Sequence, residues 1–326
     1  MRGKQAIKIS NNRVRYSFEL TRNITVVQGN SGTGKTTLFD MVSAYARLQD
    51  KSGVQVQCDK KCVALHADGD WQSVLERTVD SIVFIDEDAD YVDSEAFAAS
   101  LKASDNYYVI FSREAMHNLP YSVEEIYEIK TSGKYHTFQK RYKAQKGCLY
   151  AKTSAGKKFD TVLTEDSHAG LEFYRHLYEG TNVQCETSFG NAGLFAWLMQ
   201  HINEHEKIFV VADGAAIGSE MGRLMTLQHQ YTDKIALCMP ESFEWLILQS
   251  GVIDTPDLQE MLANPSAAIE SKQYFSWENY FTEYLVQHTT GTHYAYTKAH
   301  LHAFYTVKQN SKRIVALIAM AMPKTK

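Results

Sequence analysis

The sequence predicts an α/β protein with two domains and a helical C-terminal segment, and three observations lead to this prediction. Short apolar runs typical of buried strands alternate with amphipathic stretches typical of helices. The length of 326 residues exceeds the usual size of a single domain. A basic stretch of small and polar residues interrupts the alternation near the middle of the chain. We therefore expect a first domain at 1–145, a basic linker at 146–159, a second domain at 160–254 and a helical segment at 255–326.

The first domain is expected to begin with antiparallel strands and to continue as strand–helix alternation. Apolar residues alternate with polar ones on both sides of Asn11-Asn12, which predicts a β-hairpin over 6–20. A short apolar strand at 24–28 is followed by a loop and by an amphipathic helix from Thr36 to about Leu48. Further strands are expected at 82–85 and 107–111, with a second hairpin at 126–138.

The loop between this strand and helix has the composition of a phosphate-binding loop. It reads Gly29-Asn30-Ser31-Gly32-Thr33-Gly34-Lys35-Thr36-Thr37, which is G-x-x-x-x-G-K-[ST] followed by a second Thr. Glycines in such a loop let backbone N–H groups turn towards an anion at the N-terminus of a helix. Lys35 would bind the β- and γ-phosphates, and the Thr36 hydroxyl would ligate Mg²⁺. The sequence therefore predicts a nucleoside triphosphate site with ATP and Mg²⁺ as its ligands.

Polar residues follow two later strands of the same domain. The apolar strand at 82–85 ends in Asp86 and Glu87, which are expected to hold Mg²⁺ through water and to orient the attacking water, respectively. The strand at 107–111 ends in Ser112 and Arg113, either of which could sense the γ-phosphate. Arg113 fits an ordinary surface residue equally well, and both interpretations stay open.

A basic segment over 130–158 joins the two expected domains. It contains nine Lys or Arg residues and no Asp or Glu, namely Lys130, Lys134, Lys140, Arg141, Lys143, Lys146, Lys152, Lys157 and Lys158. Three tyrosines lie between them, and positive charge with aromatic rings suits a nucleic-acid backbone and unstacked bases. A solvated strand face and linker is the alternative. The formal net charge of −4 restricts any nucleic-acid contact to a local surface.

Carboxylates follow three apolar strands of the second domain, in which strands are expected at 161–165, 183–187, 207–213 and 235–239. Glu165 ends the first strand, Asp213 the third, and Glu244 (or Glu241) follows the fourth. Parallel strands place their carboxyl ends at one edge of the sheet. We therefore expect these carboxylates to form one acidic cluster that binds Mg²⁺.

The C-terminal segment and the termini give fewer signals. Aromatic residues at 274, 277, 281 and 284 have helical spacing and predict a core or interface stripe, while the histidines there lack the paired spacing of a metal site. The five cysteines show no zinc pattern, no signal peptide is recognised, and the apolar run at 314–322 is too short to span a membrane. These features predict a cytoplasmic protein.

The two motifs of the first domain resemble the ATP-binding heads of the ABC, SMC and overcoming-lysogenization-defect (OLD) ATPases, over about residues 5–141. Residues 160–250 resemble a Toprim domain, in which Glu165, Asp213 and Glu244 (or Glu241) match the metal-binding carboxylates. This domain order is that of OLD-like nucleases. The resemblance implies an ATPase with Glu87, Lys35 and Arg113 in catalytic positions, joined to a metal-dependent nuclease that acts on nucleic acid.

Three departures from these families weaken the implied activities. No L-S-G-G-Q stretch precedes the strand at 82–85, and Arg113 stands where the resemblance implies a His. Toprim domains usually have a D-x-D motif that begins at the position of Asp213, and Ala215 stands here in place of the second Asp. Both an active and a degenerate nuclease are therefore open. A non-catalytic, nucleotide-dependent regulator that binds a protein partner or forms a homo-oligomer is the alternative function. A small-molecule kinase is disfavoured because no Arg-rich lid is evident.

Overall fold

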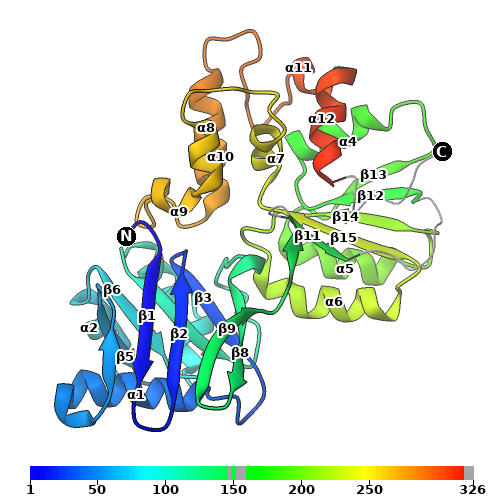
Figure 1. The fold of residues 1–326 in the computed structure, drawn as a ribbon. Coiled ribbons are helices and arrows are strands. Elements are labelled where there is room, and N and C mark those ends of the chain that lie inside the picture. The colour runs from blue at the N-terminus through cyan, green and yellow to red at the C-terminus, as the bar shows by residue number, and fades with distance from the viewer. Residues whose placement is uncertain (146–147, 152–158, 319–326) are drawn as a thin grey trace. The chain divides into compact units, whose positions relative to one another are not determined.

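The chain folds into two compact units, each with its own sheet (Figure 1). The computed structural model describes residues 1–145, 148–151 and 159–318. Unit 1 comprises 1–142 and 264–276, and unit 2 comprises 143–263 and 277–326. Both units mix helices and strands, so the α/β class is confirmed. Among the described residues, no helix is long and apolar enough to cross a membrane.

Unit 1 is built on a nine-stranded mixed sheet with the order β4-β1-β2-β9-β8-β3-β7-β6-β5. Strands β8, β3, β7, β6 and β5 are parallel neighbours, whereas β1 pairs antiparallel with both β2 and β4. The hairpins predicted at 6–20 and 126–138 are confirmed as β1–β2 and β8–β9. The strands are β1 (Gln5–Ser10), β2 (Arg15–Leu20), β3 (Ile24–Gln28), β4 (Gln55–Gln57), β5 (Lys61–Leu65), β6 (Ser81–Ile85), β7 (Tyr107–Ser112), β8 (Ile126–Ser132) and β9 (Tyr135–Lys140).

Helix α1 (Lys35–Leu48) packs against this sheet and carries much of the core of unit 1. Its buried residues include Leu38, Phe39 and Val42, which join apolar residues of β1, β2 and β6 in one cluster. Burial of these side chains stabilises the helix by about 1.5–3 kcal/mol for each. Strands β4 and β5 lie at opposite edges of the sheet although only residues 58–60 connect them. Shorter helices are α2 (Trp71–Glu76) and α3 (Glu95–Lys102).

A segment from late in the sequence completes unit 1. Residues 264–276, which the sequence analysis groups with the C-terminal segment, belong to this unit and include α9 (Pro265–Ala268). The amide of Gly3 donates to the carbonyl of Ser266 at 2.8 Å, and the Asn23 side chain donates to the carbonyl of Phe275 at 3.0 Å. These two hydrogen bonds to backbone carbonyls of the segment hold it beside the residues that precede β1 and β3.

Unit 2 is built on a six-stranded sheet with the order β10-β11-β15-β14-β12-β13. Its four parallel strands are those predicted from the apolar runs, and β11 adds antiparallel to β15. All residues of β12, β14 and β15 are buried, as expected when both faces of a parallel sheet are covered. The strands are β10 (Ala144–Gln145), β11 (Cys148–Ala151), β12 (Thr161–Thr164), β13 (Gln184–Thr187), β14 (Ile208–Val211) and β15 (Ile235–Pro240).

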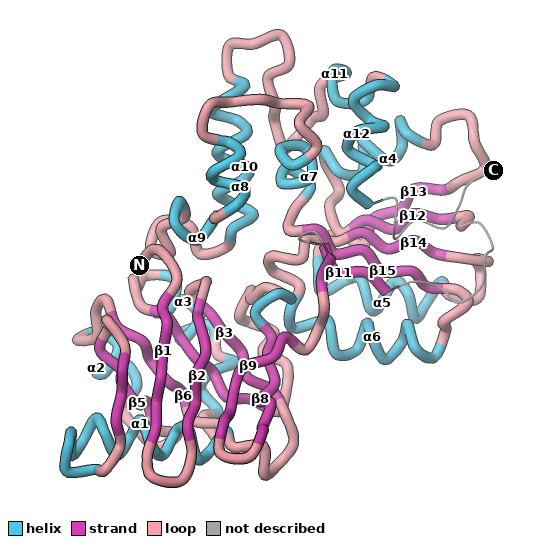
Figure 2. The backbone as a smooth tube through the Cα atoms, viewed as in Figure 1, coloured by secondary structure: helices cyan, strands magenta, loops and turns pink. Residues whose placement is uncertain are grey.

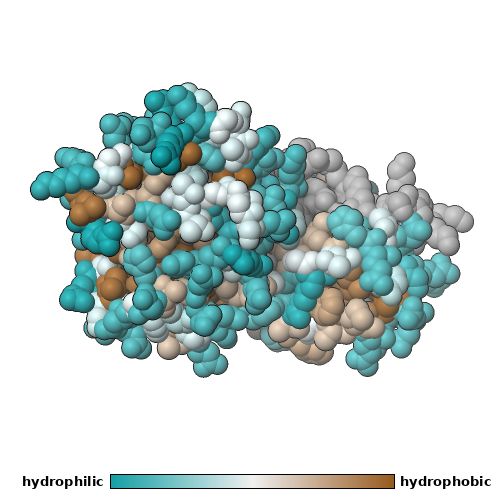
Figure 3. Space-filling model, turned by 90° about the horizontal axis from the view of Figure 1, so that it is seen from below, coloured by the Kyte–Doolittle hydropathy of each residue, from teal (hydrophilic) through white to brown (hydrophobic). Residues whose placement is uncertain are grey.

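Helices cover both faces of the sheet of unit 2. Right-handed crossovers place α5 and α6 on the face opposite α4, because the chain reverses direction across the sheet after β13. Figures 1 and 2 show this division. The helices are α4 (Ala169–Leu177), α5 (Asn191–His201), α6 (Met221–Gln230), α7 (Phe243–Gln249), α8 (Leu258–Ala263), α10 (Trp277–Thr289), α11 (Ala303–Thr306) and α12 (Lys308–Ile318). On the face seen in Figure 3, hydrophilic residues surround smaller apolar groups.

Candidate functional site

The Gly29–Thr37 loop comprises the connection from β3 to α1 and the first turn of that helix, whose N-terminus has no side-chain cap. Gly34 precedes the helix with a φ of 101°, and its carbonyl accepts a hydrogen bond of 2.9 Å from the Tyr16 hydroxyl. A Cβ atom at Gly34 would lie 2.8 Å from that hydroxyl oxygen. Glycine is therefore required there by its backbone conformation and by the close approach of Tyr16. The free N–H groups of the first turn can bind an anion.

Lys35 is buried and folds back over its own loop. Its Nζ donates to the carbonyls of Gly29 and of Asn30, the latter at 3.1 Å, and lies 3.1 Å from Glu87 Oε1. Only 3% of its side chain is exposed. The ammonium group is therefore surrounded by acceptors of its own loop and of Glu87.

Glu87 lies between two cations, Lys35 at the start of α1 and Arg113 after β7. It follows β6, and Arg113 follows β7, the strand that separates β6 from β3 in the sheet. Arg113 Nε lies 3.0 Å from Glu87 Oε1, and Arg113 Nη2 lies 3.4 Å from Glu87 Oε2. Partial burial favours a higher pKa for Glu87. Hydrogen bonds from Arg113 and Lys35 outweigh this effect and hold the pKa of Glu87 below its usual value. The carboxylate is therefore ionised at neutral pH.

A cavity of about 290 Å³ brings these groups together within unit 1. Glu87 and Arg113 line it beside the loop, whereas Asp86 is not among its lining residues. The Ser112 hydroxyl donates to the carbonyl of Glu114 at 2.8 Å and takes part in its own turn. The lining residues are Val14, Tyr16, Ser31, Gly32, Thr33, Gly34, Lys35, Thr36, Thr37, Glu87, Arg113, Thr131 and His136.

The carboxylates expected to cluster in unit 2 come from neighbouring strands. Glu165 follows β12 and Asp213 follows β14, and these two strands pair in parallel register. The amide N–H of Asp213 donates to Glu165 Oε2 at 3.0 Å. The Asn191 amide nitrogen, when oriented as a donor, lies 2.6 Å from the same oxygen. Glu165 and Asp213 therefore lie together at this edge of the sheet, through a contact that joins the Glu165 carboxylate to the backbone of Asp213.

Glu244 reaches the same cluster from α7, one turn beyond β15. Its side chain is 1% exposed, and Oε1 accepts a hydrogen bond of 2.8 Å from the Tyr296 hydroxyl. Its second oxygen, Oε2, is buried and makes no hydrogen bond within the described structure. Glu278 on α10 and Lys298 form an ion pair at this place. Such a buried, unpaired carboxylate oxygen is a ligand type that divalent cations prefer.

The carboxylates of this cluster repel one another. Burial, with a smaller contribution from Glu278, raises the pKa of Glu165 to about 7. Burial raises the pKa of Asp213 well above its usual range, as do the charges of Glu278, Glu165 and Glu244. A cation at this place would stabilise the ionised carboxylates. Within the described ranges, no group of three or more His, Cys, Asp or Glu side chains is placed so that it could hold a metal ion as the side chains stand.

Sequence reasoning missed three members of the cluster, namely Glu278, Tyr296 and Lys298. They come from α10 and from the loop after it, more than 60 residues along the chain from Asp213. The aromatic spacing over 274–284 predicted the helix, but no local pattern marks a lysine that pairs with a distant carboxylate. Glu241, the other candidate after β15, is 7% exposed, and its carbonyl accepts a hydrogen bond from Ala215 N–H.

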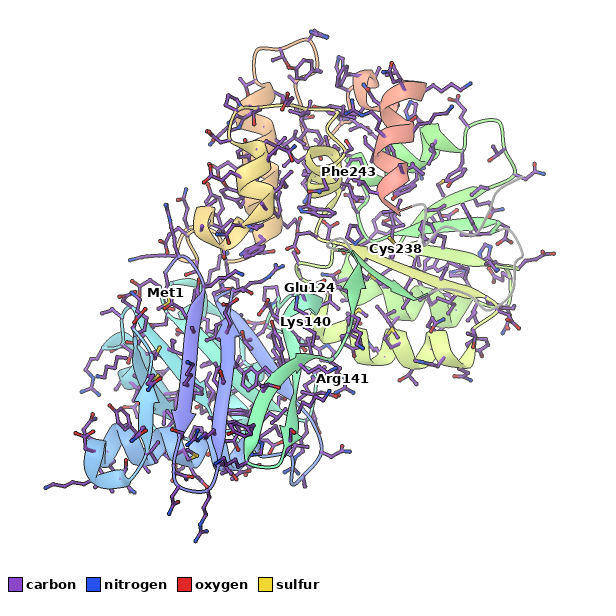
Figure 4. All side chains as sticks on the ribbon, in the orientation of Figure 1. Met1, Glu124, Lys140, Arg141, Cys238 and Phe243 are labelled. Atoms are coloured by element: carbon purple, nitrogen blue, oxygen red, sulfur yellow. The ribbon has the colours of Figure 1, made fainter. Side chains whose placement is uncertain are left out.

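The basic segment is partly neutralised in the described structure. Lys140 pairs with Glu124, and Arg141 Nε lies 3.7 Å from Glu128 Oε1 (Figure 4). The four lysines Lys146, Lys152, Lys157 and Lys158 are outside the described residues. Tyr135 at the β8–β9 hairpin is 52% exposed and has two cations over its ring, Lys134 at 5.6 Å and Arg15 at 6.0 Å. These three side chains form one exposed cationic group at the β8–β9 hairpin.

Comparison with known proteins does not assign the chain to a family. No protein-family model matches it. A search of curated protein sequences gave no match either.

Proposed function

We propose that unit 1 binds ATP with Mg²⁺ and hydrolyses it. One observation carries this proposal: the uncapped helix N-terminus, the Lys35 ammonium and the ionised Glu87 carboxylate meet at a single cavity. The first two attract phosphates, and the third can orient a water molecule. Calorimetric titration of the wild-type chain with ATP and Mg²⁺, combined with a phosphate-release assay, tests the proposal. An absence of binding heat would contradict it.

The sequence context of the loop supports the same function. A G-x-x-x-x-G-K-[ST] match is specific when a strand precedes it and a helix follows, and β3 and α1 occupy these places. Thr36 would ligate Mg²⁺, which when bound neutralises charge on the phosphates, and Asp86, which lies outside the cavity lining, would hold the ion through water. Lys35 would exchange the Glu87 carboxylate for phosphate oxygens. Glu87, released from Lys35 and kept ionised by Arg113, would then orient the attacking water.

For unit 2 we infer a Toprim-like function, in which the acidic cluster acts on nucleic acid with a divalent cation. The contact between Asp213 and Glu165 and the unpaired Oε2 of Glu244 support this assignment. These carboxylates fit one cation by their donor chemistry. The cation would supply a Lewis acid for phosphodiester chemistry, and the carboxylates would fix its place in the sheet edge.

Plasmid nicking distinguishes an active from a degenerate acidic cluster. We expect the wild-type chain to nick supercoiled plasmid with Mn²⁺, and we expect Asp213→Asn to remove nicking because the cluster loses a ligand charge. ATP hydrolysis should be unchanged in this variant. The exposed carboxylate Asp254 offers a matched control, since Asp254→Asn should nick normally. Equal nicking by wild type and Asp213→Asn would contradict the assignment.

Nucleic-acid binding is proposed to involve the cluster of Arg15, Lys134 and Tyr135. We expect the affinity for single-stranded DNA to fall steeply as the salt concentration rises, because lysine and arginine side chains that bind phosphates displace counterions from them. Replacing Arg15 and Lys134 by Ala should reduce the slope of log affinity against log salt by about 1–2. Lys140→Ala is the control, because Lys140 is already paired with Glu124 and should change the slope less. A gel-shift titration measures both effects, and equal slopes for all variants would contradict this surface assignment.

A second candidate function is a nucleotide-dependent regulator without nuclease activity that binds a protein partner. The presence of Lys298 among the carboxylates favours it, because an internal cation reduces the need for a metal. ATP binding without plasmid nicking, under the conditions given above, would support this second function over the first.

A further inference from the structure

A strap formed by residues 296–301 crosses the carboxyl edge of the sheet of unit 2. The strap begins after α10, where Tyr296 N–H donates to Thr289 Oγ1 at 2.9 Å. At its far end, Leu301 N–H donates to Glu172 Oε2 on α4 at 2.6 Å. Both ends are therefore hydrogen-bonded to helices of unit 2, and the strap has a fixed place.

The middle of the strap is attached to the elements that carry the acidic cluster. The carbonyl of Lys298 accepts a hydrogen bond of 3.2 Å from Ala169 N–H, at the start of α4. The hydroxyl of Tyr296 donates to Glu244 Oε1. Tyr296 is 2% exposed, so this hydrogen bond is shielded from solvent. The strap thus presents two functional groups to the carboxylates, the hydroxyl of Tyr296 and, two residues later, the ammonium of Lys298.

Lys298 supplies the positive charge within this arrangement. Its Nζ forms an ion pair with Glu278 and interacts electrostatically with Glu244 and Asp213. The side chain is 40% exposed, so it lies at the solvent side of the cluster and not beneath it. A lysine carries its charge on a flexible stem of four carbons, which allows it to move away without a change in the backbone.

One buried oxygen of the cluster is not used by the strap. Glu244 Oε2 makes no hydrogen bond in the described structure, although its partner oxygen is bound by Tyr296. A single ammonium cannot satisfy four carboxylates, and a divalent cation supplies twice the charge with several coordination positions. The same carboxylates therefore accept either Lys298 or a metal ion, and the two cations repel one another.

We propose that Lys298 is a tethered counter-ion that competes with a divalent cation for the cluster of Glu165, Asp213, Glu244 and Glu278. The inference rests on the proposed function of this cluster as a cation site. The strap then controls metal loading. With Lys298 in place the cluster has a low affinity for a divalent cation, and displacement of the ammonium group raises that affinity. A polyanionic ligand that attracts Lys298 would couple its own binding to loading of the metal.

The test is direct measurement of Mn²⁺ binding by calorimetry in the nucleotide-free chain. Lys298→Met keeps an unbranched side chain of nearly the same length and removes its charge, and we expect it to bind Mn²⁺ at least about tenfold more tightly than wild type. The control Lys312→Met, at an exposed lysine of α12, should bind like wild type. Adding Asp213→Asn to Lys298→Met should remove the gain, which identifies the acidic cluster as the site.

Thermal unfolding gives a second measurement that does not require tight binding. In EDTA, Lys298→Met should unfold at a lower temperature than wild type, because its carboxylates lack a counter-ion, and Mn²⁺ should restore the loss. Wild type should respond little to Mn²⁺. Should Lys298→Met not fold, Tyr296→Phe loosens the strap without a change of charge and should also raise Mn²⁺ affinity.

The outcomes separate the inference from the proposed function. Equal Mn²⁺ affinity in wild type, Lys298→Met and Tyr296→Phe would overturn the competition while leaving the cluster a cation site. No Mn²⁺ binding in any of them would overturn both the cation site and the inference. Weaker binding in Lys298→Met than in wild type would also overturn the inference, because Lys298 would then assist the metal.

Discussion

Replacing Lys35 by Ala is expected to weaken ATP binding by about 10- to 150-fold. The variant loses one charge-assisted hydrogen bond to phosphate, which contributes about 1.5–3 kcal/mol. Glu87 keeps its second cation, Arg113, so the carboxylate at the end of β6 is not left unpaired and the fold should persist. Calorimetric titration with ATP and Mg²⁺ measures the change.

A matched control excludes a general effect of removing positive charge from unit 1. Lys102 is exposed at the end of α3, and Lys102→Ala should bind ATP like wild type. Unchanged ATP affinity in Lys35→Ala would show that the Gly29–Thr37 loop does not hold the phosphates. The proposed nucleotide site would then be wrong.

Replacing Glu87 by Gln is expected to slow ATP hydrolysis by about 100- to 10,000-fold, the usual contribution of a positioned general base. ATP affinity should be preserved or raised, because the neutral amide competes less strongly than a carboxylate for Lys35. Single-turnover hydrolysis separates this effect on the chemical step from binding.

The neighbouring carboxylate Glu114 provides the comparison for this second variant. It is exposed after β7 and lies outside the cavity that holds Glu87, so Glu114→Gln should hydrolyse ATP at the wild-type rate. An unchanged rate in Glu87→Gln would remove Glu87 from the role of base. A loss of ATP binding in the same variant would indicate a structural role for the ion pair with Lys35.

Both candidate sites could be predicted from sequence as far as they depend on strand ends. The apolar runs at 82–85 and 208–211 are central strands, and their buried faces leave Asp86, Glu87 and Asp213 at the carboxyl edge. The contact between Asp213 and Glu165 follows from the pairing of β12 with β14. The hydrophobic pattern of the sequence predicts these strand ends because each one depends only on its own strand and the strand beside it.

Features that depend on distant pairing could not be predicted in this way. Strand β4 has only Val56 as an apolar residue, so its sequence resembles a loop, and pairing with β1 makes it a strand. The position of Arg113 beside Glu87 depends on the order of β6 and β7 in the sheet. Lys298 reaches the acidic cluster because of the path of the chain after α10, which hydropathy does not encode.

The assignment of residues 264–276 to unit 1 has a consequence for synthesis of the protein on the ribosome. The chain leaves unit 1 at 142, forms most of unit 2, returns for 13 residues counted from 264 to 276, and leaves again. Domains usually fold as they emerge, the N-terminal one first. Here unit 1 lacks its final backbone partners for Gly3 and Asn23 until most of unit 2 has been made. The two units are therefore interdependent during translation, and no single cut in the gene would release both of them complete.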